Sequence, residues 1–123
     1  MIKIIVLLAV AILGISCQKE SLPNGTYTAN TVDGTICIEL QGKNKCITYF
    51  QGGDKPDEGT YHISNGEIDL MTHASITVSG KTRSWWFGGD LGKGTISGSS
   101  FTIQAQRVWN VDIERLYLTF RKQ

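Results

Sequence analysis

Two histidines and a carboxylate lie in the one stretch of this chain whose spacing brings metal-binding or catalytic side chains together. In residues 59–78, GTYHISNGEIDLMTHASITV, Asn65-Gly66 separates two alternating runs and predicts a two-residue β-hairpin. That register places His62 opposite Asp69, with His73 further along the same face. Imidazole and carboxylate groups are adequate zinc ligands, but these lie on the solvent face of a strand and no nucleophile accompanies them. We therefore expect no enzyme, no metal site and no cofactor, and interpret His62 and Asp69 as a surface pair.

The other face of the same hairpin is apolar. The predicted register pairs Ile63 with Ile68 and Tyr61 with Leu70, so each apolar residue lies opposite another. The second run continues this alternation, with Thr72 as its one polar member, through Ile68, Leu70, Ala74, Ile76 and Val78. The pattern predicts a long antiparallel strand with one buried face and one solvated face.

A glycine-rich run at residues 88–95, GGDLGKGT, has the residue types of a phosphate-binding loop. Its spacing differs, because Phe87 stands where the first glycine is required and Gly94 stands where Ser or Thr must follow the lysine. A strand is expected after this run, so no helix N-terminus would face a phosphate. We interpret it as a flexible loop between strands.

Cys37 and Cys46 flank a second expected hairpin, with strands over 35–40 and 43–50. A two-residue turn at Gln41-Gly42 would set Cys37 directly opposite Cys46 and Ile36 opposite Ile47. In an oxidising compartment this register favours a disulfide on the solvated face, which would contribute about 2–3 kcal/mol because its loop is short. Two free thiols are the alternative.

The N-terminal segment has the features of an export signal. A basic start is followed by an apolar run over 4–15, too short to span a bilayer and of the length found in signal peptides. The run ends in Gly14-Ile15-Ser16-Cys17, which resembles the lipobox of bacterial lipoproteins, although Leu13 is one place further from the cysteine than usual. The resemblance implies cleavage after residue 16 and acylation of Cys17, for example with palmitate. An ordinary secretory signal and an uncleaved anchor are the alternatives.

The expected organisation is a signal peptide over 1–16, a tether over 17–24 and one domain over 25–123. Cleavage removes Lys3 and leaves 11 basic and 11 acidic residues, so the mature chain is near neutral. Without a basic patch, nucleic acid is not an expected partner. Gln18-Lys19-Glu20 resembles the signal that sends some lipoproteins to the outer face of the outer membrane, and a plain solvated tether explains it as well. Lipid on Cys17 would supply the membrane anchor.

The sequence pattern of the mature chain predicts a series of strands joined by turns. A weak repeat supports this layout, since Gly-Thr opens a hairpin at Gly25, Gly59 and Gly94. The fold class predicted is all-β, a single antiparallel up-and-down barrel of eight or nine strands, because closure removes exposed edges. The expected strands are 25–30, 35–40, 43–50, 59–64, 67–78, 83–87, 95–97, 100–107 and 114–121. The expected loops at the rim are 51–58, 88–94 and 108–112.

This layout resembles the small lipocalin-like (calycin-type) lipoproteins of Gram-negative bacteria. In both, a lipidated cysteine and a short tether precede one barrel. The resemblance covers Cys17 onward and concerns layout; where lipocalins carry Gly-x-Trp, this chain has Gly25-Thr26-Tyr27. It implies a barrel that binds a small apolar molecule.

Both bulky and small side chains are expected to point into the barrel, and they favour opposite conclusions about a ligand cavity. The bulky residues expected to point inward are Tyr27, Ile38, Tyr49, Tyr61, Leu70, Trp85, Phe101 and Phe120. They favour a filled interior, whereas Thr72 and Ala74 leave room for a ligand. Trp86 must point outward if its neighbour Trp85 points inward, and is then a stacking platform unless another segment covers it. The candidate ligand-binding residues are Tyr61, Thr72, Ala74, Trp85, Trp86 and Trp109.

Two functions remain. The first is a lipid-anchored, non-catalytic binding module of the outer membrane or cell surface that holds a small apolar ligand. The second is a protein-binding inhibitor of a lysozyme or peptidase, which would insert a loop into the cleft of its target. An apolar void above about 300 Å³ would favour the first, and a packed interior with a protruding loop the second.

Overall fold

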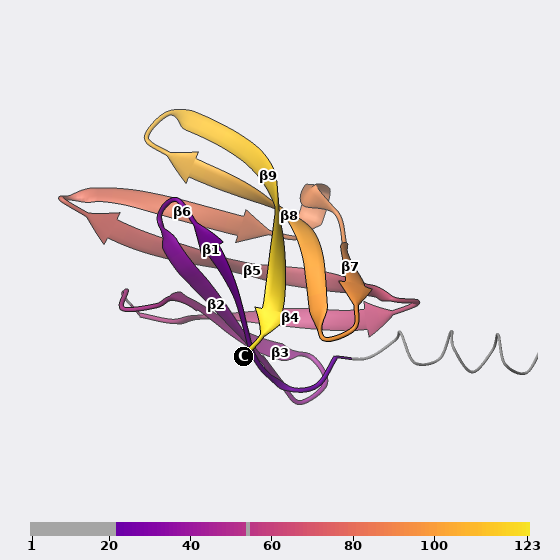
Figure 1. Cartoon of the computed structure of the whole chain (residues 1–123). Helices are drawn as coiled ribbons and strands as arrows, with labels where there is room; N and C mark the ends of the chain where they lie inside the picture. The colour runs from indigo at the N-terminus through magenta and orange to yellow at the C-terminus, as the bar shows by residue number, and fades with distance from the viewer. Residues whose placement is uncertain (1–21, 54) are drawn as a thin grey trace, which may run out of the picture.

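The computed structural model describes residues 22–53 and 55–123 and forms an all-β fold, as predicted (Figure 1). The expected signal peptide, Cys17 and most of the expected tether lie outside the described residues. One short 3-10 helix, η1 (Gly89–Leu91), interrupts the strands. The strands are β1 (Gly25–Thr31), β2 (Gly34–Gln41), β3 (Lys45–Phe50), β4 (Asp57–Ser64), β5 (Glu67–Val78), β6 (Lys81–Phe87), β7 (Gly94–Ser97), β8 (Ser100–Trp109) and β9 (Asp112–Lys122).

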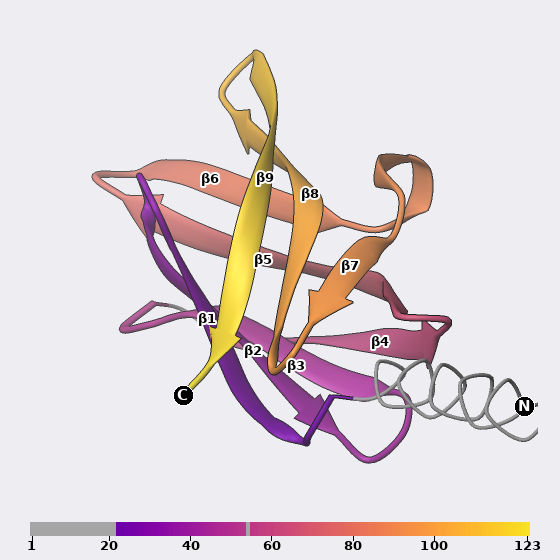
Figure 2. The ribbon, with the colours of Figure 1, turned by 45° about the vertical axis from the view of Figure 1, so that its right-hand side comes forward.

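Eight of the strands close into an antiparallel barrel. The order around it is β1-β2-β3-β4-β5-β6-β8-β9, and β9 returns to β1 through Thr28 opposite Arg121 and Tyr27 opposite Lys122. Figures 1 and 2 show this ring from two sides. Because consecutive strands pair throughout, apart from β6 and β7, the predicted up-and-down barrel is confirmed.

The ninth strand, β7, occupies the same position in the sheet as β6. Both lie between β5 and β8, with β6 at one end and β7 at the other. The glycine-rich residues 88–93 form the excursion between them, including η1. Gly88 makes this path possible, because its φ is +98° and a Cβ would collide with the carbonyl oxygen of Leu70.

The hairpin at Asn65-Gly66 has the predicted register. Asn65 and Gly66 take φ values of +55° and +76°, and Ile63 lies opposite Ile68. Tyr61 likewise lies opposite Leu70, and His62 opposite Asp69. Asn and Gly tolerate positive φ, so this dipeptide fixed the pairing of both strands.

The prediction for the cysteine hairpin was wrong. The loop between β2 and β3 has three residues, so Cys37 lies opposite Tyr49 and Cys46 opposite Leu40. A shift of three residues reverses the faces of β3: Cys46 points into the barrel, while Tyr49 points outward and its hydroxyl donates a 2.9 Å hydrogen bond to Glu39 Oε2. The two cysteines are therefore free buried thiols on opposite faces of the sheet, and the expected disulfide is absent.

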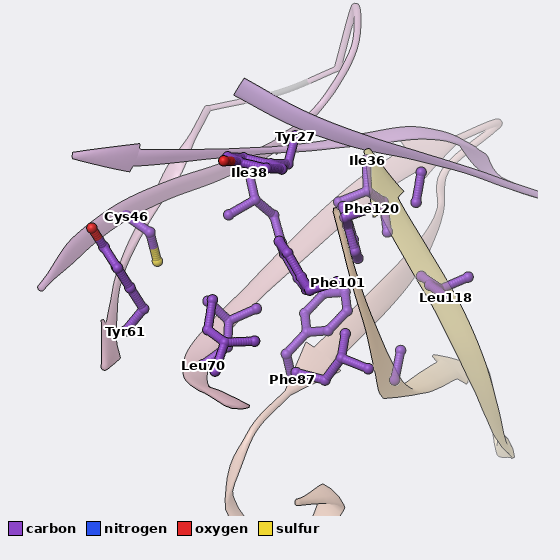
Figure 3. Close-up of a cluster of buried hydrophobic side chains, with 14 of the residues drawn as sticks. Tyr27, Ile36, Ile38, Cys46, Tyr61, Leu70, Phe87, Phe101, Leu118 and Phe120 are labelled. Carbon is purple, nitrogen blue, oxygen red and sulfur yellow. The ribbon is translucent and has the colours of Figure 1, made fainter. Parts of the chain in front are cut away.

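Side chains fill the interior of the barrel, as Figure 3 shows. Phe101 and Phe120 stack with their ring centroids 5.1 Å apart, and Tyr27 and Phe87 pack against them at 5.7 Å. The largest fully buried side chains are Trp85, Tyr27, Phe50, Phe101 and Phe120. The prediction of a bulky core is confirmed, with Phe50 in the place expected for Tyr49.

The two ends of the barrel differ. We call the end at which the described chain begins the near end, and the opposite end the far end. At the near end Leu22 is buried in the core, and the Tyr61 hydroxyl donates a hydrogen bond to the carbonyl oxygen of Gly42. At the far end lie the turns at 32–33, 79–80 and 110–111. The loop expected over 108–112 is reduced to the two residues Asn110 and Val111, because β8 runs to Trp109 and β9 begins at Asp112.

Candidate functional site

A buried carboxylate closes the far end of the barrel. Asp33, in the turn between β1 and β2, is 5% exposed and accepts hydrogen bonds from Arg107 Nε (2.7 Å) and Nη2 (3.0 Å). The indole Nε1 of Trp85 donates a third, at 2.9 Å. A carboxylate with this many charge-assisted bonds is firmly held, so the β1–β2 turn is fixed across the barrel mouth.

Two arginines share this one carboxylate. Arg83 Nε lies 3.2 Å from Asp33 Oδ1, beside the fork from Arg107. Burial would raise the pKa of the Asp33 carboxyl, but the hydrogen bonds from Arg107 and Trp85 and the charges of both arginines hold it below its ordinary value. The carboxyl is therefore ionised at neutral pH and cannot serve as a general acid.

Trp109 completes the cluster by packing against both cations. The Cζ atoms of Arg83 and Arg107 each lie 5.3 Å from the centroid of its ring, within the range of cation–π attraction. Its Nε1 and Arg83 Nη1 are buried without a hydrogen-bond partner in the described part of the chain. Glu114 Oε1, 4.0 Å from Arg107 Nη1, adds a second, exposed carboxylate beside the two guanidinium groups. The Asp33–Arg83–Arg107–Trp109 cluster is thus a structural plug.

The other interior candidates do not line a ligand site. Thr72 donates a 2.7 Å hydrogen bond to Thr48, and Ala74 lies opposite Trp85 with both residues fully buried. The hydroxyl of Tyr61 bonds to the backbone at the near end. Of the six predicted ligand-binding residues, four are core residues, Trp109 belongs to the plug and Trp86 is outside.

Trp86 lies on the outer face of β6, as predicted, and is 45% exposed. Its ring stacks on His73 of β5 with the centroids 4.5 Å apart and the planes at 17°. His73 Nε2 lies 3.4 Å from Asp57 Oδ2, which holds the imidazole from its other side. The indole is therefore a braced, half-exposed platform.

More apolar side chains surround Trp86 on the outer side of β5, β6, β8 and β9. The sheet register sets His73, Trp86, Gln106 and Arg115 in one row, and Ser84, Val108 and Ile113 in the next. We call the outer side of these four strands the Trp86 face. Its exposed large apolar residues are Met71, Trp86, Ile113 and Tyr117.

Metal and nucleophile chemistry finds no support in the described residues. No group of three or more His, Cys, Asp or Glu side chains gathers within them, and the short ion contact of His73 is to Asp57 and not to Asp69. Burial raises the pKa of the Cys37 and Cys46 thiols, which disfavours the reactive thiolate.

The surface hollows of the described residues include two of moderate size. One, of about 360 Å³, opens over β3 and β4 and is lined by Lys45, Cys46, Glu58, Gly59 and Thr60, among others. The other, of about 250 Å³, lies beside the plug and is lined by Gly80, Lys81, Thr82, Trp109 and Asn110. Both are open to solvent and mixed in polarity, unlike the enclosed apolar cavity of a lipid carrier.

Two arginines at inward strand positions are the signal in the sequence for the plug. Arg83 shares the inward face of β6 with Trp85 and Phe87, and Arg107 follows the inward-facing Ala105 on β8. An arginine at an inward position requires a buried acceptor. Asp33 is the carboxylate that fills this role from a turn, a position usually solvated.

Comparisons with protein-family models, curated proteins and solved structures found no match to this chain. Among the residues described, no helix is both long enough and apolar enough to cross a bilayer. The eight-stranded antiparallel barrel is consistent with a lipocalin-like architecture.

Proposed function

We propose that this chain is a non-catalytic binding module that recognises a partner protein through the outside of its barrel. The observation that carries the proposal is the contrast between a filled interior and a braced, half-exposed Trp86 on the outer surface. Aromatic, methionine and arginine side chains are enriched at protein interfaces, and the Trp86 face presents all three.

A small apolar ligand inside the barrel is the less favoured function. Trp85, Phe101 and Phe120 occupy the space such a ligand would need, and none of them is solvent-accessible. Moving large core side chains costs several kcal/mol, since interiors are close-packed. The interior therefore supports stability better than ligand binding.

The β8–β9 hairpin favours an inhibitor among partner-binding roles. Figure 2 shows it standing out from the rest of the barrel. Val111 at its tip is 85% exposed, and Ile113 and Tyr117 follow on the outer side of β9. A stiff hairpin with an apolar tip suits insertion into the cleft of a lysozyme or peptidase, at a low cost in conformational entropy.

We further propose that lipid on Cys17 anchors the module to the outer membrane. The described chain enters at the near end through Leu22, whereas the plug and the β8–β9 tip lie at the far end. Anchored through residues 17–21, the barrel would present its far end away from the membrane. A partner in the periplasm or outside the cell would then meet the hairpin tip first.

The proposal is tested by assaying the protein, purified in detergent, against a panel of lysozymes and secreted peptidases. Inhibition of one enzyme is expected, and Trp86→Ala should weaken it about tenfold or more while leaving the melting temperature unchanged, because the side chain is outside the core. Val32→Ala, at an exposed turn off the Trp86 face, is the matched control. A stoichiometric apolar molecule extracted from the purified protein, with no enzyme inhibited, would refute the proposal.

A further inference from the structure

The barrel leaves most of β9 without a neighbouring strand on one side. The described part of β1 pairs with β9 only at Tyr27 and Thr28, near the C-terminal end of β9. From Asp112 to Thr119, the β-strand partners of β9 in the described chain all belong to β8. Figure 2 shows the yellow strand rising away from β1. This segment is an exposed sheet edge.

The free hydrogen-bonding groups of this edge follow from the strand alternation. Lys122 N–H donates to the carbonyl of Ser99 on the β8 side, whereas Gln123 N–H donates to that of Thr26 on the β1 side. In antiparallel strands the N–H and C=O of one residue point to the same side, and successive residues alternate. Odd-numbered residues therefore present both groups to the bare side, namely Ile113, Arg115, Tyr117 and Thr119.

The plug explains why β1 does not cover these groups. Asp33, at the tip of the β1–β2 turn, is drawn over the barrel mouth by its bonds to Trp85 and Arg107. β1 ends at Thr31, short of the register that would reach residues 112–117 of β9. The turn that ends β1 is thus held over the barrel mouth, away from residues 112–117 of β9.

The side chains beside the edge define the strand that would fit. Ile113 and Tyr117 are 65% and 70% exposed, and Arg115 lies exposed between them. Arg115 is the one cation on this outward face of residues 112–119, while the exposed carboxylates Asp112 and Glu114 lie at the alternate positions. A complementary strand would place an acidic side chain opposite Arg115 and apolar side chains opposite Ile113 and Tyr117.

We infer that residues 112–119 of β9 bind an extended acidic-apolar segment of a partner protein by adding it to the sheet as a further strand. Main-chain hydrogen bonds to alternate residues give such strand addition its affinity, and cross-strand side-chain pairs give it specificity. Long exposed edges are usually protected in soluble proteins, so an edge held open by a buried cluster has the properties of a docking site. The inference rests on the proposed partner-binding function and assigns a surface to it.

The test uses amide hydrogen exchange, measured by NMR, on the protein in detergent. The probe, called the Val-Glu peptide, is acetylated and amidated Val-Thr-Glu-Thr-Val-Thr-Glu-Thr-Val, which alternates Val and Glu along one face of the strand. The Val-Lys control has Lys in place of Glu, and a further control carries N-methyl groups on alternate backbone nitrogens. The amides of Ile113, Arg115 and Tyr117 should exchange fast alone and slow by about tenfold with the Val-Glu peptide at millimolar concentration. The control peptides should slow them much less.

Two variants separate backbone recognition from charge. Arg115→Pro removes an outward N–H but no main-chain bond to β8, and costs only the exposed 3.1 Å hydrogen bond from Arg115 Nε to Gln106 Oε1. The fold should therefore tolerate it while peptide binding is lost. Arg115→Glu keeps the backbone and should shift the preference from the Val-Glu to the Val-Lys peptide, a readout that stands even if the proline variant misfolds. Absence of protection by any peptide would overturn the inference, and so would protection that rises with protein concentration alone, which would show a second copy on the edge.

The enzyme panel distinguishes the two proposals. If Arg115→Glu and Arg115→Pro inhibit the target enzyme as well as the unmodified protein while Trp86→Ala does not, the partner-binding function stands and the edge assignment fails. If no enzyme is inhibited but the peptide protects the edge, the strand-addition site stands without the proposed inhibitor role.

Discussion

The carboxylate of Asp33 and the guanidinium of Arg107, 74 residues apart in sequence, are joined by two hydrogen bonds of 2.7 and 3.0 Å. This fork connects the turn between β1 and β2 to the inner side of β8. It closes the far end of the barrel and draws the tip of β1 away from β9. One ion pair thereby sets both the end of the core and the extent of the bare edge.

Asp33→Asn should destabilise the fold by about 3 kcal/mol, because it leaves two largely buried guanidinium groups without their counter-charge. Urea unfolding followed by tryptophan fluorescence measures this. Asp112→Asn, at an exposed carboxylate in the neighbouring hairpin, is the control and should change the free energy of unfolding by less than about 0.5 kcal/mol. A loss below about 1 kcal/mol for Asp33→Asn would show that the plug is not structural.

The stability of the protein should fall in acid through the same carboxyl. The folded state lowers the pKa of Asp33, so its contribution is fully present above the ordinary value of about 3.9 and is lost as the pH drops through the lower folded value. The difference in free energy of unfolding between the unmodified protein and Asp33→Asn should therefore shrink below about pH 4. A difference that stays constant from pH 7 to below pH 3 would contradict the assignment.

Both cysteines of the barrel should behave as unreactive free thiols. Cys37 and Cys46 are 4% and 1% exposed, and burial raises the pKa of each thiol. Iodoacetamide should label neither in the native protein, and both after unfolding without a reductant, as counted by mass spectrometry. Labelling that requires prior reduction would instead demonstrate a disulfide, and with it a different register of β2 and β3.

The hairpin of β4 and β5 and the division of Trp85 and Trp86 between the two faces could be predicted from local rules. Asn65-Gly66 specifies its turn through backbone conformation, and strand alternation assigns each tryptophan to a face. The β2–β3 register could not be predicted in this way, because Gln41-Gly42 fits both a two-residue and a three-residue loop. The difference reversed the faces of β3 and removed the expected cysteine pairing.

The plug and the bare edge depend on contacts between distant segments. Nothing near Asp33 in the sequence shows that Arg83 and Arg107 will surround it, since all three meet only after the barrel closes. The exposure of β9 likewise depends on how far β1 runs beside it. The alternation of apolar and polar residues predicted the barrel, but it could not predict where β1 and β9 cease to pair.

Site-specific photo-crosslinking in growing cells tests the central claim most directly, namely that recognition occurs on the outside of a filled barrel. A benzophenone amino acid would replace Trp86 or Tyr117 on the Trp86 face, or Glu58 on the outer face of β4 as the control. The account predicts one crosslinked protein from positions 86 and 117, absent from position 58, and diminished at position 117 when Trp86→Ala is added. Crosslinking that is equal at all three positions, or absent from 86 and 117, would contradict it.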